Sequence, residues 1–487
     1  MLLNRIAMFL LMIMVFLTGF PYCLRLDVPS FLSLINHILS DSDNSNNNNS
    51  DSNNSGSNNS GSNNSGSNNS GSSGNTFTPA IGVLDTSFNS PNGFIIQPIG
   101  SRDDYGRSLA IQPDGKILLG GYCRGVSNDD FCIARFNPNG TLDTTFRSSG
   151  KVIQPISSHH DWGYSLAIQP DGKILLGGHC HNGSNFDFCI ARFNSDGISD
   201  GTLDTSFNSS GKVIQPIGSS HDYGQSLAIQ RDGKILLGGR CLIIMGFNEF
   251  CIARFNSNGT LDTTFGSPNG YIIQSIYPSE DWGYSLAIQP DGKILLGGSC
   301  INPNNANRWE FCIARFNSDG ISDGTLDTSF GNSGRVRQAI GSGDDWGQSL
   351  VIQPDGKILL GGYCHNGSNF DFCIARFNPN GTLDTTFGTG GKVIQPISSA
   401  DDKGYSLAIQ PDEKILLGGT CDGDFCIARF NPNGTLDTTF GNGGKVIQPI
   451  GSSSDFGNSL AIQSDGKILL GGYCFNGNYD FCIARFK

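Results

Sequence analysis

The feature that most constrains the fold is a sevenfold internal repeat. The string LDT[ST]F begins at seven positions, and corresponding residues in successive copies lie 53 to 65 residues apart. The seventh copy runs to Lys487, so no partial repeat is left over. Repetition at this period indicates a series of similar supersecondary units that bury their apolar faces against one another. The copies begin at Leu84, Leu142, Leu203, Leu261, Leu326, Leu383 and Leu436.

Each unit predicts four short β-strands. In the sixth copy these are Lys392–Ile397, Ser406–Gln410, Lys414–Gly419 and Phe425–Phe430, separated by turns rich in Pro, Asp, Asn and Gly. Such units either close radially into a propeller or stack into an open solenoid, and seven four-stranded units favour the propeller. We therefore expect an all-β, seven-bladed β-propeller. The copy at Leu84 precedes the first complete blade and should fill the junction between blades seven and one.

The N-terminal region predicts export. Arg5 and the apolar run Ile6–Phe20 are typical of a signal peptide, within a segment 1–23, and an uncleaved short anchor is the alternative. Residues 24–75 read as a short helical segment followed by an Asn/Ser/Gly-rich flexible linker. The propeller is expected over 76–487, and the protein should be secreted or on the cell surface. Its repeats should start near residues 83, 141, 202, 260, 325, 382 and 435.

Three strings, LDTTFG, QPDGKILLGG and FCIARFNPNG, resemble the delta-60 repeat family over residues 83–487. The resemblance implies propeller blades of a kind found mostly in bacterial surface and secreted proteins, with no defined activity. This sequence departs from the family pattern by carrying Cys where Ala or a small polar residue is common.

Fourteen of the fifteen cysteines form one pair per repeat, at the base of the loop between the third and fourth strands. Neighbouring antiparallel strands are close enough for a disulfide, and an exported protein reaches an oxidising compartment. We predict seven disulfides; small buried apolar residues and zinc ligands are the alternatives. The pairs are Cys123/Cys132, Cys180/Cys189, Cys241/Cys251, Cys300/Cys312, Cys364/Cys373, Cys421/Cys426 and Cys474/Cys482.

A candidate ligand face lies on the same side of the disc as the cysteine-bracketed loops. There the turn before the second strand of each unit supplies an Asp followed in most blades by an aromatic residue, a combination that suits sugars. In the alternative interpretation Asp caps the turn and the aromatic ring packs between blades. The candidates are Asp104, Tyr105, Asp161, Trp162, Asp222, Tyr223, Asp281, Trp282, Asp345 and Trp346.

Two blades depart from the repeat. Blade two carries His159, His160, His179 and His181 in two loops of the same face, a candidate metal site because imidazole binds Zn, Cu and Ni. Solvated loop residues are the alternative. Blade three has an apolar loop that is a candidate partner contact, since exposed apolar patches often mark interfaces; burial against the disc is the alternative. That loop contains Leu242, Ile243, Ile244, Met245 and Phe247.

Charge and motif content limit the function. The formal net charge is −12, with 31 Lys and Arg against 43 Asp and Glu, which argues against nucleic acid. No nucleophile–base pattern stands out and no cofactor is expected. We expect a non-enzymatic binding or adhesion propeller, monomeric, with a glycan or a protein as partner, and membrane contact only through an uncleaved N-terminal anchor. A structural surface protein without a dedicated ligand, and a polysaccharide hydrolase or lyase, are the alternatives.

Overall fold

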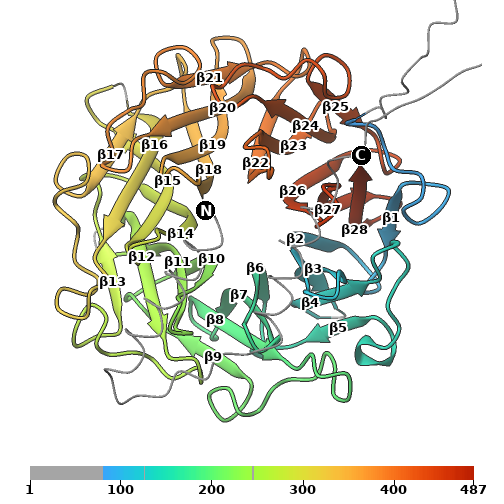
Figure 1. The fold of residues 1–487 in the computed structure, drawn as a ribbon. Helices are drawn as coiled ribbons and strands as arrows, with labels where there is room; N and C mark the ends of the chain where they lie inside the picture. Colours follow the sequence, from blue (N-terminus) through green and yellow to red (C-terminus); the bar gives the residue numbers. More distant parts are fainter. Residues whose placement is uncertain (1–80, 126, 244–245, 306) are drawn as a thin grey trace, which may run out of the picture. The chain divides into compact units, whose positions relative to one another are not determined.

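The structure is a computed structural model that describes residues 81–487 except 126, 244–245 and 306. Seven four-stranded antiparallel sheets are arranged in a circle (Figure 1), so the predicted seven-bladed propeller is confirmed. The predicted signal segment and linker lie outside the described residues. Among the residues that are described, no helix is long and apolar enough to cross a bilayer.

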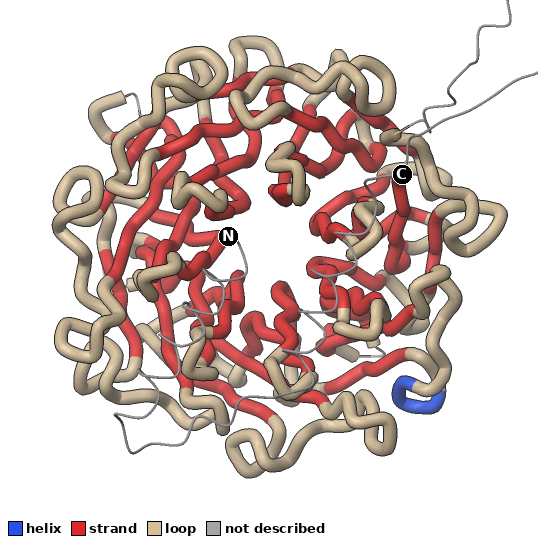
Figure 2. Tube along the Cα trace, in the orientation of Figure 1, coloured by secondary structure: helices blue, strands red, loops and turns tan. Residues whose placement is uncertain are grey.

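The blades are built from four concentric sets of strands, with loops at both ends of each strand (Figure 2). The innermost strands are β2(Asp104–Ile111), β6(Asp161–Ile168), β10(Asp222–Ile229), β14(Asp281–Ile288), β18(Asp345–Ile352), β22(Asp402–Ile409) and β26(Asp455–Ile462). The second strands are β3(Ile117–Arg124), β7(Ile174–His181), β11(Ile235–Leu242), β15(Ile294–Asn302), β19(Ile358–His365), β23(Ile415–Cys421) and β27(Ile468–Phe475). The third strands are β4(Asp129–Phe136), β8(Phe186–Phe193), β12(Asn248–Phe255), β16(Arg308–Phe316), β20(Phe370–Phe377), β24(Asp424–Phe430) and β28(Tyr479–Phe486).

The outermost strands have four residues each. They are β5(Lys151–Gln154), β9(Lys212–Gln215), β13(Tyr271–Gln274), β17(Arg335–Gln338), β21(Lys392–Gln395), β25(Lys445–Gln448) and, for blade seven, β1(Phe94–Gln97). A 3₁₀ turn, η1(Phe146–Ser148), precedes β5. The sequence unit as we divided it opens with this outer strand, but the structure pairs the strand with the preceding blade. The blade therefore begins one strand later than the sequence unit.

The ring closes as predicted from the N-terminal copy of the repeat. Strand β1 pairs antiparallel with β28, and Leu84 forms a bridge with Phe486, so the two ends of the propeller share blade seven. Blade seven thus has the same four strands as the others, three from the C-terminus and one from the N-terminus (Figure 1).

The hydrophobic core lies between blades, because each apolar cluster combines residues of two successive sheets. Glycines make this packing possible. A Cβ at Gly120 would overlap the side chain of Leu166 in the next blade, and a Cβ at Gly121 would overlap the carbonyl oxygen of Tyr105. The Gly pair of each unit is thus a place of close backbone approach, and a β-bulge lies opposite it, between Gly106 and Ser108 of the inner strand.

A serine in each inner strand links neighbouring blades around the centre. Its hydroxyl accepts a hydrogen bond of 2.9–3.0 Å from the amide of a leucine in the next inner strand, as Ser108 does from Leu166. The series includes the pair Ser459 and Leu109, which joins blade seven to blade one. The inner wall is therefore a closed circle of seven equivalent contacts.

On the opposite face from the cysteine-bracketed loops, the Asp and Phe of the LDT[ST]F string pack against the Arg of the FCIARF strand. We call this Asp–Arg–Phe contact the clasp. Its Asp makes an ion pair of 2.7–3.0 Å with the buried Arg of the FCIARF strand, and its fully buried Phe lies 4.5–4.8 Å from that guanidinium. The Thr or Ser hydroxyl of the string also donates to the Asp, as Thr145 does to Asp143. Burying this charge is tolerated because it is paired and hydrogen-bonded.

Candidate functional site

The seven predicted disulfides are present, one per blade. They join the second and third strands of the blade, which are the third and fourth strands of the sequence unit. Their Cα atoms lie 5.7–5.9 Å apart, inside the range that a disulfide spans, and all fourteen cysteines are fully buried. Seven disulfides are typical of proteins from oxidising compartments.

The placement of the second cysteine in each pair is a correction to the sequence-based expectation. We expected both cysteines at the base of the connecting loop, but the second one lies inside the third strand, opposite the second glycine of the Gly pair. It is therefore diagonal to its partner, because the residue directly across from Cys123 is Asp130. The second cysteines and their opposite residues are Cys132 and Gly121, Cys189 and Gly178, Cys251 and Gly239, Cys312 and Gly298, Cys373 and Gly362, Cys426 and Gly419, and Cys482 and Gly472.

The physical reason for this difference is the antiparallel register. Residues that share one face of a sheet alternate along each strand, so two cysteines can be bridged either directly across or along a diagonal. The loop between them varies in length from blade to blade, whereas the register of Cys132, Cys251, Cys426 and Cys482 against a glycine does not change. Being fully buried, these disulfide-bonded cysteines are crosslinks of the core.

Each bridge holds together the two strands that lead into a loop, and these loops lie on one face of the disc, which we call the loop face. They contact the next blade. Asn185, in the loop between β7 and β8, donates to the carbonyl of Ser220 in the connection that leads into β10. Asn478 likewise donates to the carbonyl of Arg102 across the closure. The two kinds of connection predicted to share one face do so, and the hydrogen bonds between them make that face a continuous surface.

The aspartates of the candidate ligand face are structural. Asp104, Asp161, Asp222, Asp281 and Asp345 are fully buried. Each accepts a hydrogen bond of 2.7–2.8 Å from the backbone N–H five residues earlier. Burial raises the pKa of Asp104, Asp222 and Asp345 to about 6 against the pull of these donors. These carboxylates are therefore buried and cap the turn, as in the structural alternative.

Six of the seven aspartates at this position are followed by an aromatic residue, and blade six has Lys403 instead. These half-buried aromatic residues lie on the loop face, and we call them the aromatic rim. The aromatic rim consists of Tyr105, Trp162, Tyr223, Trp282, Trp346 and Phe456. Trp309 joins two of its members. Its ring centroid lies 4.8 Å from that of Trp282 and 4.5 Å from that of Trp346, and those two are themselves 5.5 Å apart.

Sequence reasoning missed Trp309 because it lies in the longest and least regular cysteine-bracketed loop. Its strand position offers a signal: Trp309 lies three residues before Cys312, as Phe186 lies three residues before Cys189. In both blades the aromatic side chain at this position packs on the aromatic rim. Phe186 stacks on Trp162 with ring centroids 5.0 Å apart, as Trp309 packs on Trp282 and Trp346.

The four histidines of blade two are not brought to one point. His179 is buried among aromatic rings, and burial lowers its pKa to about 3, which keeps it neutral. His160 lies 3.1 Å from the carboxylate of Asp129, while the rings of His159 and His181 are 5.2 Å apart. Within the described part of the chain, no group of three or more His, Cys, Asp or Glu residues could hold a metal ion.

The apolar loop of blade three is only partly described. Leu242 and Ile243 are half-buried, Phe247 is 39% exposed, and the amide of Ile243 donates to the carbonyl of Phe247 at 3.0 Å. Ile244 and Met245 lie outside the described residues. The predicted partner contact at this loop stays a prediction.

Below the aromatic rim, the central channel contains a cavity of about 280 Å³. Its wall is the fourth residue of each inner strand, together with Phe456 of the rim and Tyr473 of β27. These seven wall positions hold hydrogen-bonding side chains and no carboxylate. They are Arg107, Tyr164, Gln225, Tyr284, Gln348, Tyr405 and Asn458.

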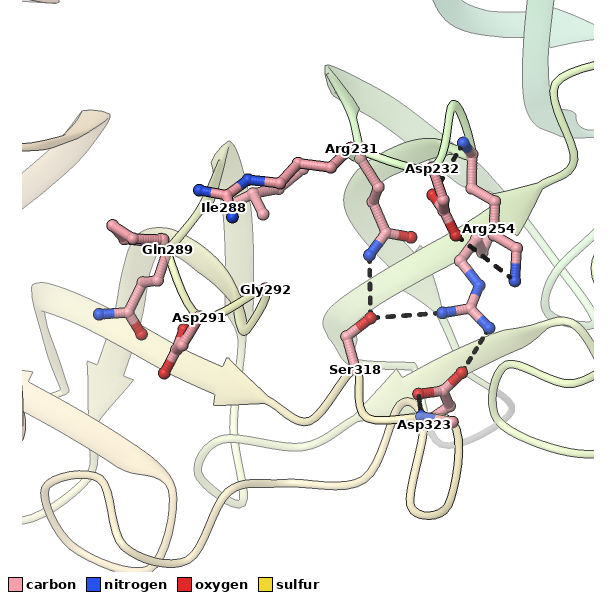
Figure 3. Close-up of a pocket in the computed structure, with 13 residues that line it drawn as sticks. Arg231, Asp232, Arg254, Ile288, Gln289, Asp291, Gly292, Ser318 and Asp323 are labelled. Atoms are coloured by element: carbon pink, nitrogen blue, oxygen red, sulfur yellow. Dashed lines mark hydrogen bonds and ion pairs between the residues drawn. The ribbon is translucent and has the colours of Figure 1, made fainter. Parts of the chain in front are cut away.

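A second pocket, of about 340 Å³, lies on the opposite face between blades three and four (Figure 3). Its polar side chains bond one another: Arg254 pairs with Asp323 at 2.6 Å, and Gln230 donates to Ser318 at 2.8 Å. Arg254 also forms an ion pair with Asp262 of its own clasp. The polar side chains of this pocket therefore connect neighbouring blades.

The fold and its repeat define the class of protein. Seven segments match a family model described as a domain of unknown function (DUF5122) beta-propeller, and the chain belongs to this family of β-propeller repeats, in agreement with the delta-60 resemblance. The matched residues are 112–146, 169–197, 230–265, 289–320, 353–387, 410–440 and 463–487. No curated protein matches the chain.

Several solved propellers are similar to this chain at a distance. A virginiamycin B lyase from Staphylococcus aureus is 12% identical over 66% of this chain and 83% of its own, with a TM-score of 0.37. The WD40 propeller domain of Doa1 is 12% identical over 81% and 97%, with a TM-score of 0.45. A protein of unknown function from Dyadobacter fermentans is 12% identical over 81% and 99%, with a TM-score of 0.43. At these values none of them informs the function of this chain.

Proposed function

We propose that this protein is a non-enzymatic binding propeller that holds a glycan on its loop face, over the aromatic rim and the mouth of the central channel. The observation that carries the proposal is the position of the rim directly beside the cavity. Phe456 belongs to both, and Tyr105 of the rim packs at 5.0 Å against Tyr473 of the cavity wall.

The chemistry of this surface suits a sugar. Half-buried aromatic rings offer flat apolar faces, and the channel wall adds amide and phenol groups from Gln225, Gln348 and Tyr284 that donate to or accept from hydroxyl groups. Ligand sites are commonly concave and aromatic with a few polar groups that set orientation.

We propose no catalytic role because the Asp side chains of the loop face are hydrogen-bonded within turns. The recurring carboxylates of the loop face are buried in turns, and the channel wall contains no Asp, Glu, His, Cys or Ser among its described lining residues. The wall groups that could transfer a proton are tyrosines, and burial raises the pKa of Tyr284 to about 12 and raises that of Tyr473, away from the neutral range in which general acid–base groups work best. The protein would act outside the cell, where its disulfides are stable and where the N-terminal segment 1–75 delivers or tethers it.

A glycan array tests the proposal with full-length, oxidised protein, with and without EDTA. We expect selective binding that EDTA leaves unchanged, and at least a tenfold loss in the variant Trp346→Ala, since removing a stacking ring costs both contact area and geometry. Ile198→Ala is the matched control, because Ile198 is 95% exposed in a loop of the opposite face. An array on which no glycan binds, or equal binding by the two variants, would overturn the proposal.

A further inference from the structure

The channel wall contains one charged residue among its seven equivalent positions. Arg107 occupies in blade one the place that Tyr, Gln or Asn occupies in the other six blades. A guanidinium is the costliest of these groups to place there, since a charge surrounded by protein needs a partner. The surroundings of Arg107 therefore have to supply a partner for its charge.

Arg107 lies in a cage of tyrosines and has no anionic neighbour among the described residues. Its guanidinium carbon lies 5.2–5.4 Å from the ring centroids of Tyr122, Tyr164 and Tyr473, and one terminal nitrogen donates to the hydroxyl of Tyr122 at 3.0 Å. Its Nε is buried and has no hydrogen-bond partner in the part of the chain that is described. The surroundings supply π faces and a phenol, but no carboxylate.

A second guanidinium packs against the aromatic rim without a carboxylate partner among the described residues. Arg240 lies 4.0 Å from the ring of Trp282 and 4.8 Å from that of Tyr223, both members of the aromatic rim. Its Nε is also buried without a partner among the described residues. The Arg240 charge acts on Tyr284 of the channel wall, whose pKa burial raises to about 12 although the guanidinium pulls it down.

The fully buried arginines among the described residues, which are those of the clasps, have carboxylate partners. In the clasps of the opposite face every guanidinium has its own aspartate, as Arg135 has Asp143 at 2.8 Å and Arg485 has Asp85 at 3.0 Å. The chain carries a net charge of −12, so acids are in surplus. Two arginines without a carboxylate at one end of the channel, within the residues that the structure describes, therefore point to an anion that comes from outside the protein.

We propose that the channel below the aromatic rim binds the carboxylate of an acidic sugar, with Arg107 as its principal partner and Arg240 as a second positive charge at the mouth. This inference rests on the proposed function and specifies its ligand as a glycan that carries hexuronate-type residues. The cavity of about 280 Å³ would take one ring of the acidic sugar, and the aromatic rim that adjoins it would take the neighbouring sugars. A guanidinium binds a carboxylate through two parallel N–H donors, which gives direction as well as charge.

The test measures the affinity of three probes for the full-length, oxidised protein by ligand-detected NMR titration. The probes are sodium D-glucuronate, its neutral counterpart D-glucose, and sodium sulfate. We expect glucuronate to bind at least tenfold more tightly than glucose. The variant Arg107→Gln reproduces the residue found at the same position in Gln225 and Gln348, so it should fold. It should weaken glucuronate binding about 10- to 100-fold, the range for a charge-assisted hydrogen bond, and leave glucose unchanged.

Arg102→Gln is the control, since Arg102 is an exposed arginine near the rim and its loss should have no effect. Equal affinity for glucuronate and glucose, an unaltered affinity in Arg107→Gln, or binding of sulfate alone would each overturn the inference. If neutral glycans bind on the array while glucuronate does not bind in solution, the acidic ligand is refuted and the proposed function stands. If neither binds, both are refuted.

Discussion

The contact that closes the ring offers a quantitative test. Asp85 is 1% exposed and accepts from Arg485 at 3.0 Å across 400 residues of sequence, while Arg485 itself is 5% exposed and lies 4.5 Å from the ring of Phe88. The change Asp85→Ala leaves a buried guanidinium without its carboxylate. Removing one partner of a buried pair costs about 3–5 kcal/mol, so the free energy of unfolding should fall by that amount.

The double variant Asp85→Ala/Arg485→Met should recover most of this loss, because an apolar residue needs no counter-charge. Asp437→Ala is the matched control: Asp437 pairs with Arg429 at 2.8 Å, only eight residues away. Both single variants lose a clasp, but only Asp85→Ala also loosens the strand that closes blade seven.

Urea denaturation gives the free energies, and hydrogen exchange followed by mass spectrometry reports on β1. We expect faster exchange of residues 94–97 in Asp85→Ala and not in Asp437→Ala, because local opening follows local loss of contacts. A change of less than about 1 kcal/mol in Asp85→Ala, set against the expected loss, or a double variant no more stable than the single one, would refute the reasoning.

Three further predictions concern the blades. Gly121→Ala places a Cβ against the carbonyl oxygen of Tyr105 and should destabilise the fold by about 1–3 kcal/mol or more, measured by urea denaturation; a neutral result would contradict the close approach. Replacing Cys364 and Cys373 by Ala removes a crosslink between residues nine apart and should cost about 2–3 kcal/mol on the chain-entropy model, while unreduced wild-type protein in denaturant should label at no more than one thiol. Burial raises the pKa of Asp281 to about 8, so the native state keeps a proton that the unfolded state releases near pH 4. The free energy of unfolding should therefore fall as the pH rises from about 4 to 8, and Asp281→Asn should flatten that slope. Equal slopes in the two proteins would contradict this prediction.

Much of the architecture could be predicted because the repeat expresses it seven times. The recurrence of LDT[ST]F indicated the number of blades, the paired cysteines indicated the disulfides, and the copy at Leu84 indicated the closure. The phase of the blade could not be predicted in the same way. A four-residue strand such as Lys392–Gln395 can pair with the strand before it or after it, and only the packing of the whole ring decides between them. The register that sets Cys132 opposite Gly121 was hidden for a similar reason, since the spacing of two cysteines does not say where the loop between them begins.

The site was harder to predict, for reasons that particular residues make clear. Asp104 looked like a ligand group because its neighbour is aromatic, but the demand of buried N–H groups for an acceptor fixes its role as a cap. Arg107 carried no signal, since one charged residue in a half-buried strand is typical of a solvated face. Its position becomes informative in the folded ring, where the same position of all seven inner strands lines one shared cavity.

The measurement that tests the central claim most directly is a titration of intrinsic tryptophan fluorescence. All four tryptophans of the chain, Trp162, Trp282, Trp309 and Trp346, lie at the aromatic rim or against it. A glycan that binds on the array should therefore change the fluorescence of the full-length, oxidised protein in a saturable way, with the midpoint at its dissociation constant. Glycan binding that leaves the tryptophan spectrum unchanged would place the ligand elsewhere on the propeller and contradict the account.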